Sequence, residues 1–353
     1  MRRGETLLSC EKSPMVDQTR NAGIDIVKAI GIVLVVIWHC QPTTVAILPD
    51  HHTAALIGKQ TIKFFYFNIS LLAVPSFILV SLYLFIGKLS KVEDYWKKRF
   101  LRLFQIYVFW VGIQFILYLL LGGSLPLPLK TIIRSGGPDL SYGFSMPPMP
   151  SIFYYLYSLI VCTVLMFLFF KLPEKIKLIL SIVVIGSSCL YFFLSSPYGI
   201  VIDTRSMKNY YVYIPLAYYL YHYKDKFIQY RSLFLIGFVL SIIAEWNFTG
   251  IPSAYGRVSI ILGSLFCVSM FVSGGFRAGR PALWLSRYSL GIFALHSYVL
   301  PAVMICHALL KRQDRVLPAQ SAPEGILLFA ATFAFTCLGV WLFAKTKLRV
   351  YVS

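Results

Sequence analysis

The sequence predicts an all-α, polytopic membrane protein: a bundle of about ten transmembrane helices with both termini in the cytoplasm. Three observations predict it, namely an apolar composition, a series of apolar runs and the distribution of basic residues between those runs. Of the 353 residues, 58% are hydrophobic and only 13% are charged, whereas about a quarter are charged in an ordinary soluble domain. The mean hydropathy is +0.72, so the chain must meet lipid.

Ten apolar runs are long enough, allowing for breaks and tilt, to cross the hydrocarbon core of a bilayer. They fall at about 24–40, 66–87, 101–121, 151–170, 177–195, 209–221, 231–247, 256–273, 288–309 and 325–343. The sixth run is short and rich in tyrosine, so it could instead line the interior of the bundle. The sequence thus divides into a cytoplasmic segment 1–23, a membrane domain 24–343 and a cytoplasmic tail 344–353.

The basic residues select the orientation of this bundle. The chain has 33 Lys and Arg against 14 Asp and Glu, a balance that invites comparison with nucleic-acid-binding proteins. With the N-terminus inside, however, 22 basic residues fall on the cytoplasmic side and 10 on the other, as the positive-inside rule requires. We therefore expect membrane lipid around the protein and no nucleic-acid partner. The seven cysteines show no paired spacing, so neither a disulfide framework nor a metal site is expected.

Three ionisable side chains of the first span, Asp25, Lys28 and His39, are candidates for function because such groups are costly inside a membrane. At 100° per residue, the positions from Lys28 to His39 close three helical turns with an error of about 20°, and Asp25 lies within about 40° of the same line. The three are predicted to share one face. His39 lies about 16 Å farther across the membrane than Lys28.

Further polar residues recur at helical spacing in later spans. Lys98 and Arg102 share a face at the start of the third span and could hold a phosphate-rich group, although topology alone also favours a basic cluster there. Ser289 and His296, two turns apart, could contact a ligand or bond to a neighbouring helix. Glu245, at the predicted depth of His39, could orient the imidazole, bind an acceptor or reach toward the membrane interface.

Four segments together resemble the acyltransferase-3 family of membrane sugar O-acyltransferases. They are the first-span pattern of Asp25, Lys28 and His39, and residues 74–83, 98–102 and 289–296. Their order and placement also match, and the resemblance extends from residue 24 to about residue 340. It implies a ten-helix bundle of the bacterial inner membrane. Such a bundle moves an acyl group, usually acetyl, from cytoplasmic acyl-CoA to a hydroxyl of a surface polysaccharide or its lipid-linked precursor.

The resemblance also assigns roles to residues. His39 matches the family's essential histidine, and Lys28 stands where arginine is usual. Lys98 and Arg102 match the ends of an Arg-x-x-x-Arg motif with lysine in the first place, which keeps the charge but loses the bidentate fork. Leu82 stands where the family generally has glycine.

In this scheme Lys28, Lys98 and Arg102 bind the anionic head of acetyl-CoA, or of another acyl-CoA. The acyl-bearing arm then runs along the first helix toward His39, where Ser289 and His296 could contact it. His39 accepts a proton from the attacking sugar hydroxyl and returns it to the thiolate; a covalent acyl-imidazole is the competing mechanism. The alternative function is a transporter or flippase of a lipid-linked sugar, but repeats and broken central helices, typical of transporters, are not evident.

Overall fold

The computed structural model describes residues 21–41, 53–92, 94–129, 131, 136–143, 149–195, 205–248, 255–313, 316 and 322–353. Most of the predicted segment 1–23 lies outside these residues, as do parts of the long connection predicted at 122–150. The described residues form helices and no strand, apart from an isolated antiparallel bridge between Leu140 and Met149. The prediction of an all-helical fold is confirmed.

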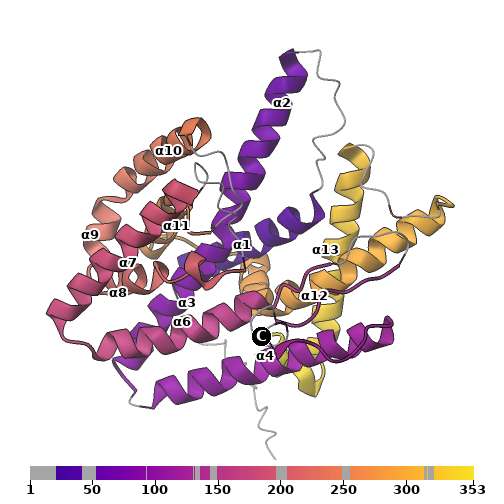
Figure 1. Ribbon diagram of the computed structural model, residues 1–353, viewed down its shortest axis with the longest axis horizontal. Helices are drawn as coiled ribbons and strands as arrows, with labels where there is room; N and C mark the ends of the chain where they lie inside the picture. Colours follow the sequence, from indigo (N-terminus) through magenta and orange to yellow (C-terminus); the bar gives the residue numbers. More distant parts are fainter. Residues whose placement is uncertain are drawn as a thin grey trace, which may run out of the picture.

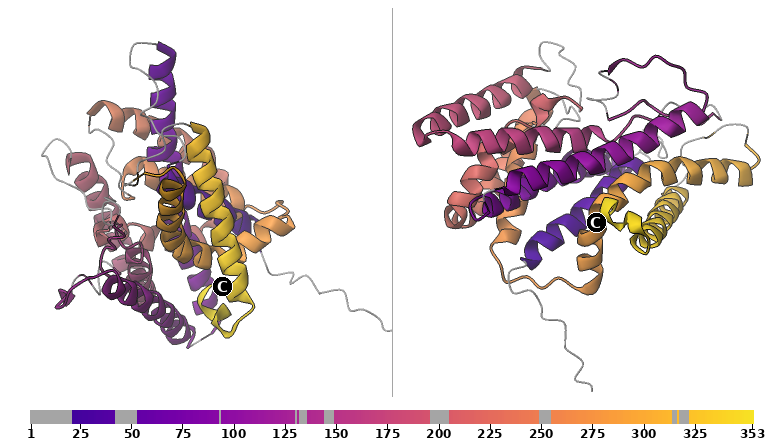
Figure 2. Two further views of the ribbon diagram at one scale, coloured as in Figure 1. Left: turned by 90° about the vertical axis from the view of Figure 1, so that its right-hand side faces the viewer. Right: turned by 90° about the horizontal axis from the view of Figure 1, so that it is seen from below.

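The main helices are arranged around α1 (Ala22–Cys40), which lies among the other helices (Figure 1). In chain order, the others are α2 (Thr53–Phe64), α3 (Ala73–Leu89), α4 (Tyr95–Leu120), α6 (Tyr154–Lys171), α7 (Glu174–Ser195), α8 (Tyr213–His222), α9 (Lys224–Gln229), α10 (Arg231–Phe248), α11 (Val258–Val272), α12 (Arg280–Leu310) and α13 (Ala322–Ala344). A π-helical segment, Phe65–Ile69, and a 3-10 turn, Ser70–Leu72, join α2 to α3 in one continuous rod. The α2 end of this rod projects beyond the bundle (Figures 1 and 2).

Eight helices of the described part of the chain are long and apolar enough to cross a membrane. Two of the ten predicted spans are shorter than expected: the sixth forms α8, of 10 residues, and the eighth forms α11, of 15. Most of α8 is buried by protein, chiefly α3 and α6. Its apolar character therefore reflects burial within the bundle and not exposure to lipid, because a helix that is apolar on every side belongs in a core.

The first span is fixed at its start by an asparagine cap and a close helix contact. The Asn21 side chain accepts hydrogen bonds from the backbone N–H groups of Gly23 and Ile24 at 2.9 and 3.3 Å, which satisfies donors that every helix start leaves free. A Cβ at Gly23 would overlap the carbonyl oxygen of Phe271 on α11. Only glycine allows this approach of α1 to α11.

The most extensive packing of α1 is against α12, which in turn packs on α13. Beyond α13, a 3-10 segment, Lys347–Tyr351, folds back onto α12. The backbone N–H of Gly291 donates to the carbonyl oxygen of Val352 at 3.2 Å, and a Cβ at Gly291 would lie 2.6 Å from the Val352 Cβ. The helices α4 and α6 lie side by side across one face of the assembly (Figure 2).

We predict that Gly23→Ala destabilises the fold, because the added methyl meets backbone of α11 that cannot rotate away. The expected loss is about 1–3 kcal/mol, visible as a lower melting temperature of detergent-purified protein. Gly112→Ala is the matched control, since a Cβ there meets nothing within 4 Å and alanine is the better helix former. Equal melting temperatures for Gly23→Ala and wild type would contradict the close contact.

Candidate active site

A cavity of about 420 Å³ lies near the ends of the bundle at which α1, α4 and α12 begin. Five of the basic residues that the structure describes line it: Lys28, Lys88, Arg99, Arg102 and Arg287. The rest of the wall is mostly apolar and aromatic, with Ser81 and Ser289 as the hydroxyl groups of α3 and α12. Its size is that of a small-molecule site, and its charge suits a polyanion with an apolar extension.

Arg99 is the most enclosed guanidinium of this cavity. Its Nη2 donates to the Ser81 hydroxyl at 2.6 Å, while its buried Nε has no hydrogen-bond partner among the described residues. Arg102 is exposed and donates to the carbonyl oxygen of Ser353 at 2.8 Å. A buried donor without a partner carries an energetic cost, so the arginine-lined wall has capacity for a further acceptor.

Lys98 does not line this cavity, although Arg102 does. Its side chain is exposed, and the adjacent Arg99 faces the cavity instead. Both Lys98 and Arg99 are within one turn of Arg102, and the rotation of α4 against α3 and α6 decides which of the two points inward.

The three polar residues of α1 all face α12. The Asp25 carboxylate accepts a hydrogen bond from the Ser286 hydroxyl at 2.5 Å, and Lys28 shares the basic cavity with Ser289. Farther along both helices, the rings of His39 and His296 lie 5.0 Å apart between centroids, at an interplanar angle of 49°. The predicted polar face of the first span is therefore present in the structure, and the same α12 face carries Ser289 and His296.

Aromatic side chains separate the basic cavity from the histidine pair. The Tyr155 and Phe293 rings are 5.1 Å apart and both line the cavity, and the Phe293 ring is 6.0 Å from that of His296. Phe293 and His39 also line a common pocket of about 10 Å³. The basic cavity, Phe293 and His39 thus follow one another along the α1–α12 contact.

A second small pocket, of about 30 Å³, adjoins the histidine pair on the side away from the basic cavity. Both His39 and His296 line it, together with Gln114 of α4 and Ser297 of α12. The segment between α4 and α6 supplies most of the remaining wall, including Tyr142, whose pKa is raised to about 12 by burial. The phenol is therefore protonated near neutral pH.

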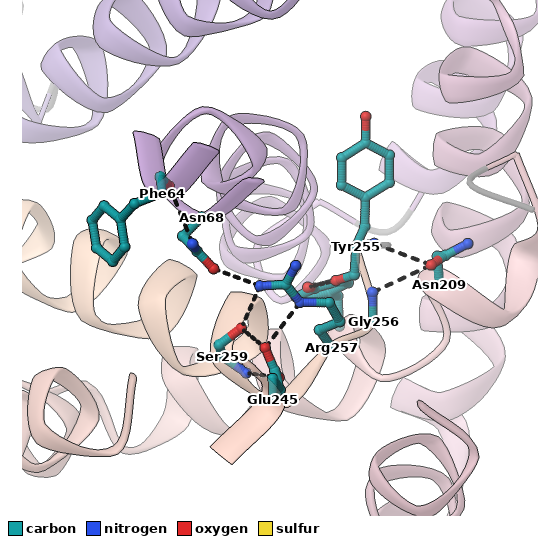
Figure 3. A network of polar contacts seen from close by, with 9 residues as sticks. Phe64, Asn68, Asn209, Glu245, Tyr255, Gly256, Arg257 and Ser259 are labelled. Atoms are coloured by element: carbon teal, nitrogen blue, oxygen red, sulfur yellow. Dashed lines mark hydrogen bonds and ion pairs between the residues drawn. The ribbon is translucent and has the colours of Figure 1, made fainter. Parts of the chain in front are cut away.

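Glu245 belongs to a buried ion-pair network (Figure 3). Its Oε2 accepts from the Arg257 Nε at 3.0 Å and from the Ser259 hydroxyl at 2.6 Å, and its Oε1 accepts from the Ser259 backbone N–H at 3.0 Å. The Arg257 Nη2 also donates to the Asn68 side chain at 2.6 Å. Glu245 and Arg257 line a cavity of about 180 Å³ that is distinct from the pockets of His39.

This network ties three parts of the chain together, since Asn68 lies in the π-helical segment, Glu245 in α10 and Arg257 at the start of α11. Next to it, the Asn209 side-chain oxygen accepts from the backbone N–H groups of Tyr255 and Gly256 at 3.1 and 3.3 Å (Figure 3). The contacts of Glu245 therefore support a structural role. The imidazole beside His39 is that of His296.

Residues 21–345 match a family model described as an acyltransferase domain. The chain belongs to the acyltransferase-3 family. Family membership makes the protein a membrane acyltransferase, with the multi-pass helical character already described. A comparison with curated proteins gave no match, and a comparison with solved structures gave none. Among the described residues, no group of three or more His, Cys, Asp or Glu is arranged to hold a metal ion.

Four of the residues that line these spaces were not named in the sequence analysis. Arg99, Arg287 and Lys88 line the basic cavity, and Tyr142 lines the small pocket. Arg99 was within reach, because it is three residues from Arg102 and so shares a face with it. Tyr142 carried no signal, since it lies in an irregular segment whose path only tertiary contacts determine.

We predict that Glu245→Ala lowers the melting temperature sharply, because it leaves the Arg257 guanidinium buried with an ion-pair partner removed. Loss of one partner of such a pair costs about 3–5 kcal/mol. The double variant Glu245→Ala/Arg257→Met should recover part of the loss, since no unpaired charge remains. If Glu245→Ala were as stable as wild type and only slower in catalysis, the structural assignment would be wrong.

Proposed function

We propose that the protein is an O-acyltransferase that moves an acyl group, most simply acetyl, from cytoplasmic acyl-CoA to a sugar hydroxyl. The acceptor is a cell-surface polysaccharide or its lipid-linked precursor, and the enzyme resides in a bacterial inner membrane with the start of α1 facing the cytoplasm. The observation that carries this proposal is the order of three features along α1 and α12. These are the basic cavity, an aromatic boundary formed by the Tyr155 and Phe293 rings, and the pair of His39 and His296.

The basic cavity suits the donor. The head of acyl-CoA bears several phosphate charges, which Lys28, Arg99, Arg102 and Arg287 can neutralise at the end of the bundle. The pantetheine arm is narrow and mostly neutral, and it suits the apolar wall formed by α3, α4 and α6. Ser289 on α12 lies along that path, which is the place expected for a group that contacts the arm.

His39 suits the role of the reacting base. It lies where the aromatic boundary ends, between two small pockets, and is half-buried. The sugar oxygen attacks the thioester carbonyl, His39 takes the hydroxyl proton, the C–S bond breaks, and the proton passes to the departing thiolate. In the alternative route the imidazole itself attacks and carries the acyl group before the sugar displaces it. Both routes end with the same ester and free CoA.

We predict that His39→Ala lowers acyl transfer at least a hundredfold, because a positioned base contributes about 10²–10⁴ to the rate. The measurement uses purified protein, radiolabelled acetyl-CoA and membranes or glycan from the producing cells. His307→Ala is the control, since that histidine pairs with Glu324 at 3.0 Å near the other end of α12. Full activity in the His39 variant would reject the proposed catalytic role, and glycan flux without acylation would favour a flippase.

We predict that Arg99→Ala raises the KM for acetyl-CoA more than Lys98→Ala does, with little change in the KM for the acceptor. The reason is that Arg99 lines the cavity and its exposed neighbour Lys98 does not. The double variant Lys98→Ala/Arg102→Ala should likewise raise the KM for acetyl-CoA more than the KM for the acceptor. Loss of Arg102 should cause most of this increase. A larger effect from Lys98→Ala than from Arg99→Ala would place the phosphates outside this cavity.

A further inference from the structure

His296 carries a buried hydrogen-bond acceptor and lines a pocket together with His39. Its side chain is fully buried, and its Nδ1 lies 3.2 Å from the carbonyl oxygen of Ile292, one turn earlier on α12. A carbonyl oxygen only accepts, so Nδ1 carries the hydrogen and, in the neutral ring, Nε2 is the acceptor. This Nε2 has no hydrogen-bond partner among the described residues. Within the described part of the chain, no acidic side chain lines the pocket to hold a charged ring.

The other polar groups of this pocket are mostly committed elsewhere. The Gln114 amide donates to the carbonyl oxygen of Pro138 at 2.9 Å, the Ser151 hydroxyl donates to that of Gly136 at 2.6 Å, and the Ser297 hydroxyl donates to that of Ala294 at 2.9 Å. The exception is Tyr142, whose buried hydroxyl has no partner among the described residues. The residues that carry this acceptor, His296 Nε2, and this protonated phenol therefore line one small pocket together with His39.

Unpartnered buried atoms in a pocket point to a missing polar ligand, because each costs free energy until it is paired. A ligand that pairs with His296 Nε2 must donate a hydrogen, and a pocket of about 30 Å³ admits only a small group. A hydroxyl group meets both conditions, and its oxygen can accept from Tyr142. The 5.0 Å separation of the two imidazole rings allows two oxygens on neighbouring carbons to meet one ring each.

We propose that this pocket binds a second hydroxyl of the acceptor, on the carbon next to the one that is acylated, through His296 Nε2. The acceptor class is thus a vicinal diol unit, with one oxygen at His39 and its neighbour at His296. This inference rests on the proposed function. It assigns to His296 a contact with the acceptor and not with the donor arm.

The test compares two small alcohols that differ by the neighbouring hydroxyl: ethane-1,2-diol and ethanol, each with radiolabelled acetyl-CoA and purified protein. Wild type should prefer the diol by about tenfold in kcat/KM, since one hydrogen bond to a buried acceptor is worth about that much. His296→Phe, which keeps a planar ring but removes the acceptor, should reduce this preference to near unity while the KM for acetyl-CoA stays unchanged. His296→Gln, which can offer a side-chain oxygen, should retain part of the preference.

His307→Phe on the same helix is the matched control and should keep the full preference. The diol site is rejected if wild type transfers acetyl to neither alcohol or to both equally. It is also rejected if His296→Phe keeps the wild-type ratio of kcat/KM values, which is the result expected if the pocket holds only a water molecule. If His296→Phe does not fold, the ratio measured with His296→Gln and with Tyr142→Phe decides, and an unchanged ratio in both rejects the proposal. Failure of the proposed function is separate, because it shows as no acetyl transfer from acetyl-CoA to native glycan by the wild-type protein.

Discussion

The contact between α1 and α12 is the constraint on which the rest of the site depends. Polar side chains at membrane depth are tolerated where they face the protein interior and find partners there. The Asp25–Ser286 hydrogen bond fixes one end of this contact, and the His39–His296 pair lies farther along it. Because both helices keep their polar residues on the shared face, the basic cavity forms at their beginning and the histidines meet beyond it.

Two kinds of buried polar group occur in this bundle, and they have different consequences. In the Arg257–Glu245 network each named group has at least one partner, and Lys177 likewise donates to Glu174 at 2.7 Å and to the Tyr218 hydroxyl at 3.0 Å. Such satisfied networks hold helices together and specify one arrangement. By contrast, Arg99 Nε and His296 Nε2 are buried beside cavities without a partner among the described residues. The first kind explains the fold, and the second kind marks where a ligand's groups would go.

Much of the fold and of the candidate site could be predicted from the sequence. The features that could not be predicted have physical reasons. Helical periodicity alone placed Asp25, Lys28 and His39 on one face, and Ser289 and His296 on another, because all five lie in regular helices. Periodicity cannot choose between Lys98 and Arg99, since each shares a face with Arg102 and only the packing of α4 resolves the rotation. The pairing of Glu245 with Arg257 depends on how α10 meets α11, for which a single sequence holds no signal. The short helix α8 looked like a span because burial in protein and burial in lipid select the same apolar residues.

The aromatic boundary at Phe293 also bears on the ion-tightness of the membrane. A chain that carries polar cavities from both directions toward one histidine risks a continuous column of water, through which protons would leak down their gradient. Here the spaces around His39 are about 10 and 30 Å³, room for little more than single water molecules, and the Phe293 and Tyr155 rings stand at the end of the larger cavity. Under the proposed function, His39 would meet a donor from the cytoplasm and an acceptor from the opposite side, while these narrow spaces would preserve the electrical resistance of the bilayer.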